Sequence, residues 1–530
     1  MNDMKANSPS FDPAEFSQRI TSESIRISHA IAPGSLDRLR SMKLEVESAE
    51  LTPMTRATLR FTLVSCMINV ADDLADAEGL FTGEEWASQA LQDAEIPRQL
   101  LSQFALHLAN AQSAIFQLAE KASGATDGSS PAFRLGNLEG LREARFLYSM
   151  IGADLSSHGD VRSRALCNLA NSLDESGRWV EAYSSYSDAL EQDPTNGNAA
   201  GNLAELLRRR LNTGKDQRGH IAAVYDSYVK RAQSLRDRTV EIAGEAVAQR
   251  WDQLQLTGSA GHLSHDGDEL DEYHQWIIAH RLALVAAVEG LGSDGERWDS
   301  ASLVGYLPVG PDTSVSPIFA AMNVLKAEYL TARRLAFRGQ SMLEESPVLQ
   351  HPDDTGSYTD TMDGAIYGES AASLLLAQRS ALDVLDKIAV TANEYFQSGM
   401  PASKVTFQNF WIDAKSGAAR PELNDEIEPH RSRLALAELA SDMDEHAMYS
   451  EAKLLRNAGT HRLVHGTWAI PTGPTKATFS TVDMDELSTA TIQALSVTRA
   501  AYLYLIDLVQ SRLIDEIEGD ENVMKLPLQE

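Results

Sequence analysis

Apolar residues spaced three and four positions apart are the feature that most constrains the fold of this chain. Over residues 367–398 such a stripe predicts a long amphipathic helix, lined by Leu374, Leu375, Leu382, Leu385 and Ala389. Ala, Leu, Glu, Arg and Gln, which favour helices, dominate the composition, and long stretches lack the alternating β-branched pattern of strands. The sequence therefore predicts an all-α protein.

The length and composition predict a cytoplasmic protein of several domains. A chain of 530 residues with 43% apolar residues is long enough for about two to four domains with sizeable cores. Cys66 and Cys167 are too few for a disulfide framework or a zinc site, which fits a reducing cytosol. The N-terminus has no apolar signal core, and no apolar run approaches the length of a membrane span. We therefore expect no membrane partner.

The net charge of −30 indicates first of all a soluble protein. An acidic surface attracts nucleic acid poorly, so any RNA contact is expected in a local basic cleft, and DNA is not expected as a partner. The densest basic run is Arg208–Arg210, which is typical of a solvated helix face and receives no function.

Residues 163–196 predict a helical hairpin that resembles the tetratricopeptide (TPR) repeat of about 34 residues. Gly177 and Trp179 stand at the predicted turn, and small residues at Ala170 and Ala182 allow the two helices to approach closely. The next stretch starts in register and then departs from the pattern, so flanking helices must cover the apolar face. An ordinary helical hairpin is the alternative interpretation.

The C-terminal part predicts four long helices, over residues 316–340, 367–398, 445–464 and 488–517, with an apolar stripe on each. Four such helices meet the requirements of a four-helix bundle. A further helix is predicted over 273–288, and residues 400–444 are expected to be a long, mixed insertion rich in polar residues. The predicted domains are an N-terminal helical region (1–130), TPR-like repeats (131–256) and the bundle domain (268–516).

The third of these helices carries the residues with the most distinctive chemistry, Arg456, Asn457 and His461. An imidazole titrates near neutrality, so His461 can accept or donate a proton. Arg456 stays charged and offers two parallel donors, which suit the developing charge on a phosphate. Asn457 could hold the imidazole or bind the phosphate.

This arrangement resembles the HEPN superfamily, whose four-helix domains carry Arg-(polar)-x3-His on the third helix. Residues 323–337 and 382–396 look like the first two helices of a TPR-associated bacterial HEPN subgroup, and residues 273–284 look like its lead-in. The resemblance implies an endoribonuclease that needs no metal and no cofactor. It also implies a homodimer in which both motifs face one cleft, where the RNA 2′-hydroxyl attacks the adjacent phosphorus.

Two further residues are candidates for the site because of their positions in the sequence. The resemblance places Asp386 on the second helix, where it could orient His461; a surface pair with Lys387 is the alternative. His465 lies one helical turn beyond His461 and could form a metal pair with it, although no third ligand is visible. Arg456 and His461 lie about 140° apart around a regular helix, a separation that a dimer could relax by pairing residues across chains.

The sequence thus predicts a ribonuclease in which the TPR-like half acts as sensor or regulator. Bacterial stress or anti-phage defence is the expected setting, and a protein or peptide ligand on the TPR-like half is possible. The alternative is a non-catalytic scaffold in which TPR-like helices bind a protein partner and the HEPN fold is silent. A buried polar network is the corresponding alternative for Arg456 and His461 themselves.

Overall fold

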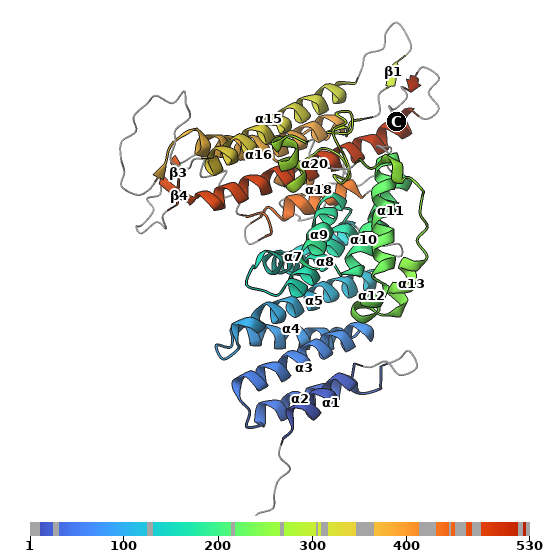
Figure 1. Ribbon diagram of the computed structural model, residues 1–530, viewed down its shortest axis with the longest axis vertical. Helices are drawn as coiled ribbons and strands as arrows, with labels where there is room; N and C mark the ends of the chain where they lie inside the picture. Colours follow the sequence, from blue (N-terminus) through green and yellow to red (C-terminus); the bar gives the residue numbers. More distant parts are fainter. Residues whose placement is uncertain are drawn as a thin grey trace, which may run out of the picture. The chain divides into compact units, whose positions relative to one another are not determined.

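The computed structural model describes residues 11–24, 31–124, 131–213, 218–264, 270–303, 306–308, 316–345, 365–412, 431–444, 447–450, 463–468, 479–517 and 523–525. Almost all regular structure in these ranges is helical, which confirms the all-α prediction (Figure 1). The chain divides into two compact units, one formed by residues 1–172 and 191–194 and the other by 173–190 and 195–530.

The first unit is a series of helices: α1 (Pro13–Ser22), α2 (Ser35–Ser48), α3 (Pro53–Asp73), α4 (Ala77–Gln92), α5 (Arg98–Ala122), α6 (Pro131–Gly136), α7 (Leu138–Ala153) and most of α8 (Gly159–Glu175). The carboxylate of Asp76 accepts the Gly79 N–H at 2.6 Å and so caps the start of α4. A Cβ atom at Gly83 would lie 2.4 Å from the Ile68 side chain, so the glycine allows α3 and α4 to pack closely.

The second unit begins with the second helix of the predicted hairpin. It contains α9 (Trp179–Gln192), α10 (Gly197–Thr213), α11 (Arg218–Ser234), α12 (Arg236–Ala243) and α13 (Glu245–Asp252), followed by the short turn η1 (Ala260–His262). Gly177 adopts the left-handed conformation (φ 76°) between α8 and α9, as expected for a residue that ends a helix. The two helices predicted over 163–196 are therefore confirmed, whereas their identity as a TPR repeat stays a prediction.

Close packing of α10 against α13 depends on Gly201. A Cβ atom at this position would lie 2.3 Å from the indole ring of Trp251, which is buried. The absence of a side chain thus lets an aromatic ring lie directly on the α10 backbone.

The C-terminal bundle is built on α15 (Pro317–Glu345), α16 (Glu369–Tyr395) and α20 (Met484–Ile517), which pack against one another (Figure 1). The shorter α18 (Ser432–Ser441) packs on α20 and on α17 (Phe407–Trp411), which η2 (Ala402–Lys404) precedes. The helices predicted over 316–340, 367–398 and 488–517 are confirmed with small changes at their ends. The segment 400–444, predicted as a mixed insertion rich in polar residues, contributes the fully buried Leu436 and Leu439 of α18.

Helix α20 has the length and composition of a membrane span, because an 18-residue window within Met484–Leu513 has a mean hydropathy of 1.2. In the bundle, however, 83% of that window is buried inside the protein. Burial in the core of the bundle therefore explains the apolar character of α20. Among the described residues, it is the one helix long and apolar enough to be a candidate span.

Short strands flank the bundle. β2 (Ala365–Ile366), β3 (Leu463–Thr467) and β4 (Phe479–Asp483) form one sheet in the order β2-β3-β4, with β3 parallel to β4. β1 (Tyr306–Pro308) pairs antiparallel with β5 (Val523–Lys525). The helix predicted over 445–464 is wrong at its C-terminal end, because Leu463 and Val464 belong to β3 and pair with β4 residues.

The helix predicted over 273–288 is also wrong in its second half. α14 (Glu272–Ala279) ends where Arg281 takes a left-handed backbone (φ 51°). The apolar residues 282–288 are buried, but the segment is not helical and several of its carbonyls accept hydrogen bonds from side chains. Arg499 donates to the carbonyls of Ala283 and Val285 at 2.6 Å each, which satisfies an irregular backbone inside the core.

Candidate functional site

The three residues predicted to carry the chemistry, Arg456, Asn457 and His461, lie outside the described residues. Their roles stay predictions. The structure does describe the residues directly before them, 447–450, and directly after them, 463–468. These flanking residues show what holds the two ends of the segment that bears the motif.

Tyr449 holds the end that precedes the motif, seven positions before Arg456. Its N–H donates to the carbonyl of Asp442, at the end of α18, at 2.9 Å. Its hydroxyl donates to Glu181 of α9 at 2.5 Å, and the side chain is buried. A residue of the predicted TPR-like hairpin therefore fixes the chain immediately before the predicted catalytic segment.

Glu181 belongs to a buried group of five residues, Arg178, Glu181, Asp442, Tyr449 and Tyr504, which we call the α9 network. Arg178 donates to both oxygens of Glu181, at 2.9 and 2.6 Å, and forms an ion pair with Asp442. Tyr504 of α20 donates to Glu181 at 3.1 Å. Two carboxylates thus share one fully buried guanidinium, which is the pairing that makes buried charge tolerable.

Electrostatics keep the arginine and the two tyrosines of the α9 network protonated. Burial by itself would lower the pKa of Arg178, but Glu181 and Asp442 raise it well above its ordinary value. Burial, together with the negative charge of Glu181, raises the pKa of Tyr449 and of Tyr504 well above the ordinary range. Both phenols therefore stay protonated and act as hydrogen-bond donors to the carboxylate.

The N-terminal end of α9 makes a second buried connection, to α20. The indole of Trp179 donates to Asp507 at 2.9 Å, and Arg210 of α10 binds the same carboxylate at 2.8 and 3.1 Å. The Arg210 guanidinium lies 4.0 Å from the centroid of the Trp179 ring. Just before α9, the hydroxyl of Ser176 donates to Glu438 of α18 at 2.6 Å. Helix α9 and the residues just before it are thus held to the bundle through Ser176, Arg178, Trp179 and Glu181.

A buried carboxyl group joins α9 and α11 to the irregular segment after α14. Glu289 accepts a hydrogen bond from Tyr228 of α11 at 2.6 Å and contacts the hydroxyl of Tyr183 of α9. Its backbone carbonyl lies 2.6 Å from Nε2 of His220. Burial raises the pKa of Glu289 to about 7, so that this group titrates near neutrality.

Asp386 lies on α16, as predicted, and is half-buried. Its carboxylate accepts the backbone N–H of Phe407 at 2.9 Å and thereby fastens the start of α17. The neighbouring Lys387 forms an ion pair with Glu328 of α15 at 2.6 Å. The proposed contact of Asp386 with His461 lies outside the described residues and stays a prediction.

His465 lies on β3 and not on a helix, so the one-helix arrangement that could have paired it with His461 does not apply. Strand pairing places His465 opposite Thr481, with Nε2 3.4 Å from the threonine hydroxyl, and its ring centroid lies 5.9 Å from that of Tyr367. Across the described ranges, no three His, Cys, Asp or Glu side chains come together to hold a metal ion.

Sequence reasoning did not find the α9 network. One signal was present, because Arg178 and Glu181 stand at the i,i+3 spacing of a helical ion pair. Nothing in the sequence linked them to Asp442 or Tyr449, which lie more than 250 positions further along the chain. The network is buried and its side chains bind one another, so it suits positioning and not catalysis.

Comparison with protein families identifies the bundle. Residues 310–512 match the family described as LA2681-like HEPN. The matched range holds α15, α16, α18 and α20, together with Arg456, Asn457 and His461. The C-terminal bundle is thus similar to the HEPN superfamily, as the sequence predicted, whereas the match does not extend to the TPR-like hairpin. A comparison with curated proteins found no match.

Proposed function

We propose that this chain is a metal-independent endoribonuclease of the HEPN type that works in the cytoplasm as a homodimer. The observation that carries the proposal is the match of residues 310–512 to an HEPN family, with Arg456, Asn457 and His461 inside the matched range. The α9 network adds support, since a buried, hydrogen-bonded cluster holds the chain seven positions before Arg456.

The proposed reaction is an internal transesterification of RNA. The 2′-oxygen forms a bond to the adjacent phosphorus, and the bond from phosphorus to the 5′-oxygen breaks. The products are a cyclic 2′,3′-phosphate and a free 5′-hydroxyl, and no water is consumed. His461 accepts the 2′-hydroxyl proton or donates one to the 5′-oxygen, and the two motifs of a dimer can divide these tasks.

The remaining residues have supporting roles in this proposal. Arg456 stabilises the charge that develops on the phosphorane, an interaction whose loss typically raises the barrier by about 2–4 kcal/mol. Asn457 holds the phosphate or the imidazole, and Asp386 orients His461. The TPR-like half acts as sensor or regulator, and the bacterial stress or anti-phage setting follows by analogy with the family.

The test uses the purified full-length chain and single-stranded RNA in EDTA. We expect cleavage with cyclic phosphate ends, and a loss of about 100-fold or more for Arg456→Ala and for His461→Ala. His158→Ala changes an exposed histidine of the first unit and serves as the matched control. Cleavage at the full rate in His461→Ala, or cleavage only with added metal, would contradict the proposal.

A second candidate function is a non-catalytic scaffold that binds a protein partner. The net charge of −30 favours it, because an acidic protein attracts RNA weakly. This candidate predicts a folded full-length protein that co-purifies with a partner and leaves RNA intact under all conditions. Cleavage that disappears in both Arg456→Ala and His461→Ala would exclude it.

A further inference from the structure

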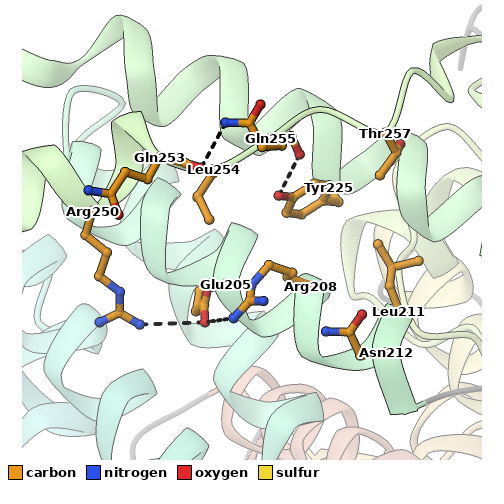
Figure 2. A pocket seen from close by; sticks show the side chains of 10 residues that line it. All are labelled: Glu205, Arg208, Leu211, Asn212, Tyr225, Arg250, Gln253, Leu254, Gln255 and Thr257. Atoms are coloured by element: carbon orange, nitrogen blue, oxygen red, sulfur yellow. Dashed lines mark hydrogen bonds and ion pairs between the residues drawn. The ribbon is translucent and has the colours of Figure 1, made fainter.

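A pocket of about 550 Å³ lies in the second unit between α10, α11, α13 and the segment that follows α13 (Figure 2). This volume lies within the range of about 300–1,000 Å³ that is usual for small-ligand sites. One side is charged, with Glu205 and Arg208 on α10 and Arg250 on α13. The lining also includes the half-buried Leu211 of α10 and Leu254, which follows α13. The pocket is therefore amphipathic.

The charged side holds two guanidinium groups and one carboxylate. Arg208 donates to both oxygens of Glu205, at 2.9 and 2.6 Å, while Arg250 approaches the same carboxylate at 3.7 Å (Figure 2). Burial would raise the pKa of Glu205, but the hydrogen bonds and charge of Arg208 lower it overall, so Glu205 is ionised. The three groups together carry one net positive charge, in a chain whose net charge is −30.

Both guanidiniums remain accessible. The side chains of Arg208 and Arg250 are 46% and 58% exposed, whereas that of Glu205 is 12% exposed. Arg250 rests on the Trp251 ring, 5.0 Å from its centroid, and its contact with Glu205 is longer than a hydrogen bond. Arg250 therefore has N–H donors that can bind an incoming anion. The carboxylate of Glu205, which contacts both arginines, is an example of such an anion.

These features select the class of ligand. A single net positive charge complements one carboxylate and falls short of the charge on a nucleoside diphosphate or triphosphate. The leucines offer a surface for an apolar side chain, and the exposed amides of Asn212, Gln253 and Gln255 at the pocket can each donate to and accept from a peptide group. We propose that this pocket binds a peptide segment with one carboxylate side chain between apolar residues, held through Arg250 and Arg208.

The experiment measures peptide binding to the full-length protein by isothermal titration calorimetry. The probes are the tripeptide acetyl-Leu-Glu-Leu-amide and its neutral isostere acetyl-Leu-Gln-Leu-amide, with adenosine monophosphate as the phosphate probe. We expect the glutamate peptide to bind at least about tenfold more tightly than both other probes, which equals about 1.4 kcal/mol. The preference should weaken as salt rises, because the pocket is open to solvent.

Arg250→Gln should remove the preference for the glutamate peptide. The matched control is Arg238→Gln, which removes a surface arginine of α12 that pairs with Glu241 at 2.6 Å with the i,i+3 spacing seen for Arg208 and Glu205. The control should bind like the wild type. No saturable binding, equal binding of the two peptides, tighter binding of adenosine monophosphate, or an equal loss in Arg238→Gln would each overturn the proposal. None of these outcomes depends on whether the chain cleaves RNA.

Discussion

At the residue scale, the most consequential contact is the one between Tyr449 and Glu181. A hydrogen bond to a buried carboxylate is stronger than one between neutral groups, and Tyr449 is the donor that connects α9 with the chain just before the predicted motif. Tyr504 donates to the same carboxylate from α20. The two phenols therefore form a natural pair of variants, because they share an acceptor and differ in their distance from the motif along the chain.

Tyr449→Phe should reduce both stability and ribonuclease activity. Loss of a hydrogen bond to a charged group costs about 1.5–3 kcal/mol of unfolding free energy. Tyr504→Phe should cost a similar amount of stability but retain most of the activity, since Tyr504 is far from the motif along the chain. Thermal unfolding measures the loss of stability. Initial cleavage rates, taken well below the unfolding midpoints of both variants, measure the loss of activity. Equal activity losses in both variants would show that Tyr449 acts through stability alone.

Glu289 gives the unfolding free energy a pH dependence. An ordinary glutamate has a pKa of about 4.5, and burial raises that of Glu289 to about 7. The unfolded chain therefore releases this proton at lower pH than the folded protein does. The stability that the protonated group contributes is present in full below about pH 4.5 and is lost as the pH rises through about 7, a total of about 3 kcal/mol.

Glu289→Gln removes the titrating group and keeps the shape of the side chain. We expect the stability of the variant relative to the wild type to grow by up to about 3 kcal/mol between about pH 5 and pH 8. Denaturant unfolding at several pH values measures this difference. A difference that stays constant over the range would contradict the assignment of a raised pKa, whatever its size at any single pH.

At the element scale, the sequence predicted the helices whose periodicity is local. α15, α16 and α20 each carry a continuous apolar stripe, and their bounds lie within a few residues of the prediction. β3 was missed because five residues carry little pattern, and a strand is stabilised by partners distant in sequence, here β2 and β4. The site follows the same rule. Arg178 and Glu181 are a local pair, whereas Asp442, the second partner of Arg178, could not be inferred from spacing in the sequence.

The packing of α10 on α13 can be tested through Gly201. Gly201→Ala places a Cβ atom 2.3 Å from the Trp251 ring, and such overpacking typically costs about 1–3 kcal/mol. Gly140→Ala on α7 is the matched control, because no atom lies within 4 Å of its added Cβ. The control should stabilise its helix by up to about 1 kcal/mol. Circular dichroism should therefore show opposite shifts in the two unfolding midpoints; a neutral Gly201→Ala would contradict the close approach.

At the scale of the whole molecule, charge and assembly act against each other. Two copies that each carry a net charge of −30 repel one another, and the proposed homodimer must overcome this repulsion. The repulsion is long-ranged in dilute salt, where the Debye length is about 30 Å at 0.01 M, and falls off within about 8 Å at physiological ionic strength. The dimer is therefore expected to become more stable as the salt concentration rises, whereas an ordinary ion pair becomes weaker.

Light scattering should reveal this dependence. We expect a mass of twice 57.9 kDa at physiological salt and a larger monomer fraction at low ionic strength. Ribonuclease activity should follow the dimer fraction, measured on the same samples. A monomer that cleaves RNA at the full rate would contradict the proposal that two motifs share one cleft. It would mean that the motif of a single copy is sufficient for cleavage.

Because α9 belongs to the second unit, the boundary between the units falls inside the helical hairpin, after Ser172. Any gene rearrangement that exchanged the N-terminal half at the end of the hairpin would strip Asp442 of Arg178 and Asp507 of Trp179. Those carboxylates would then be left in the core without these partners, which is costly. The smallest inheritable module of this protein therefore comprises the bundle together with Arg178 and α9, and a new N-terminal half preserves these pairs only if it is joined upstream of Arg178.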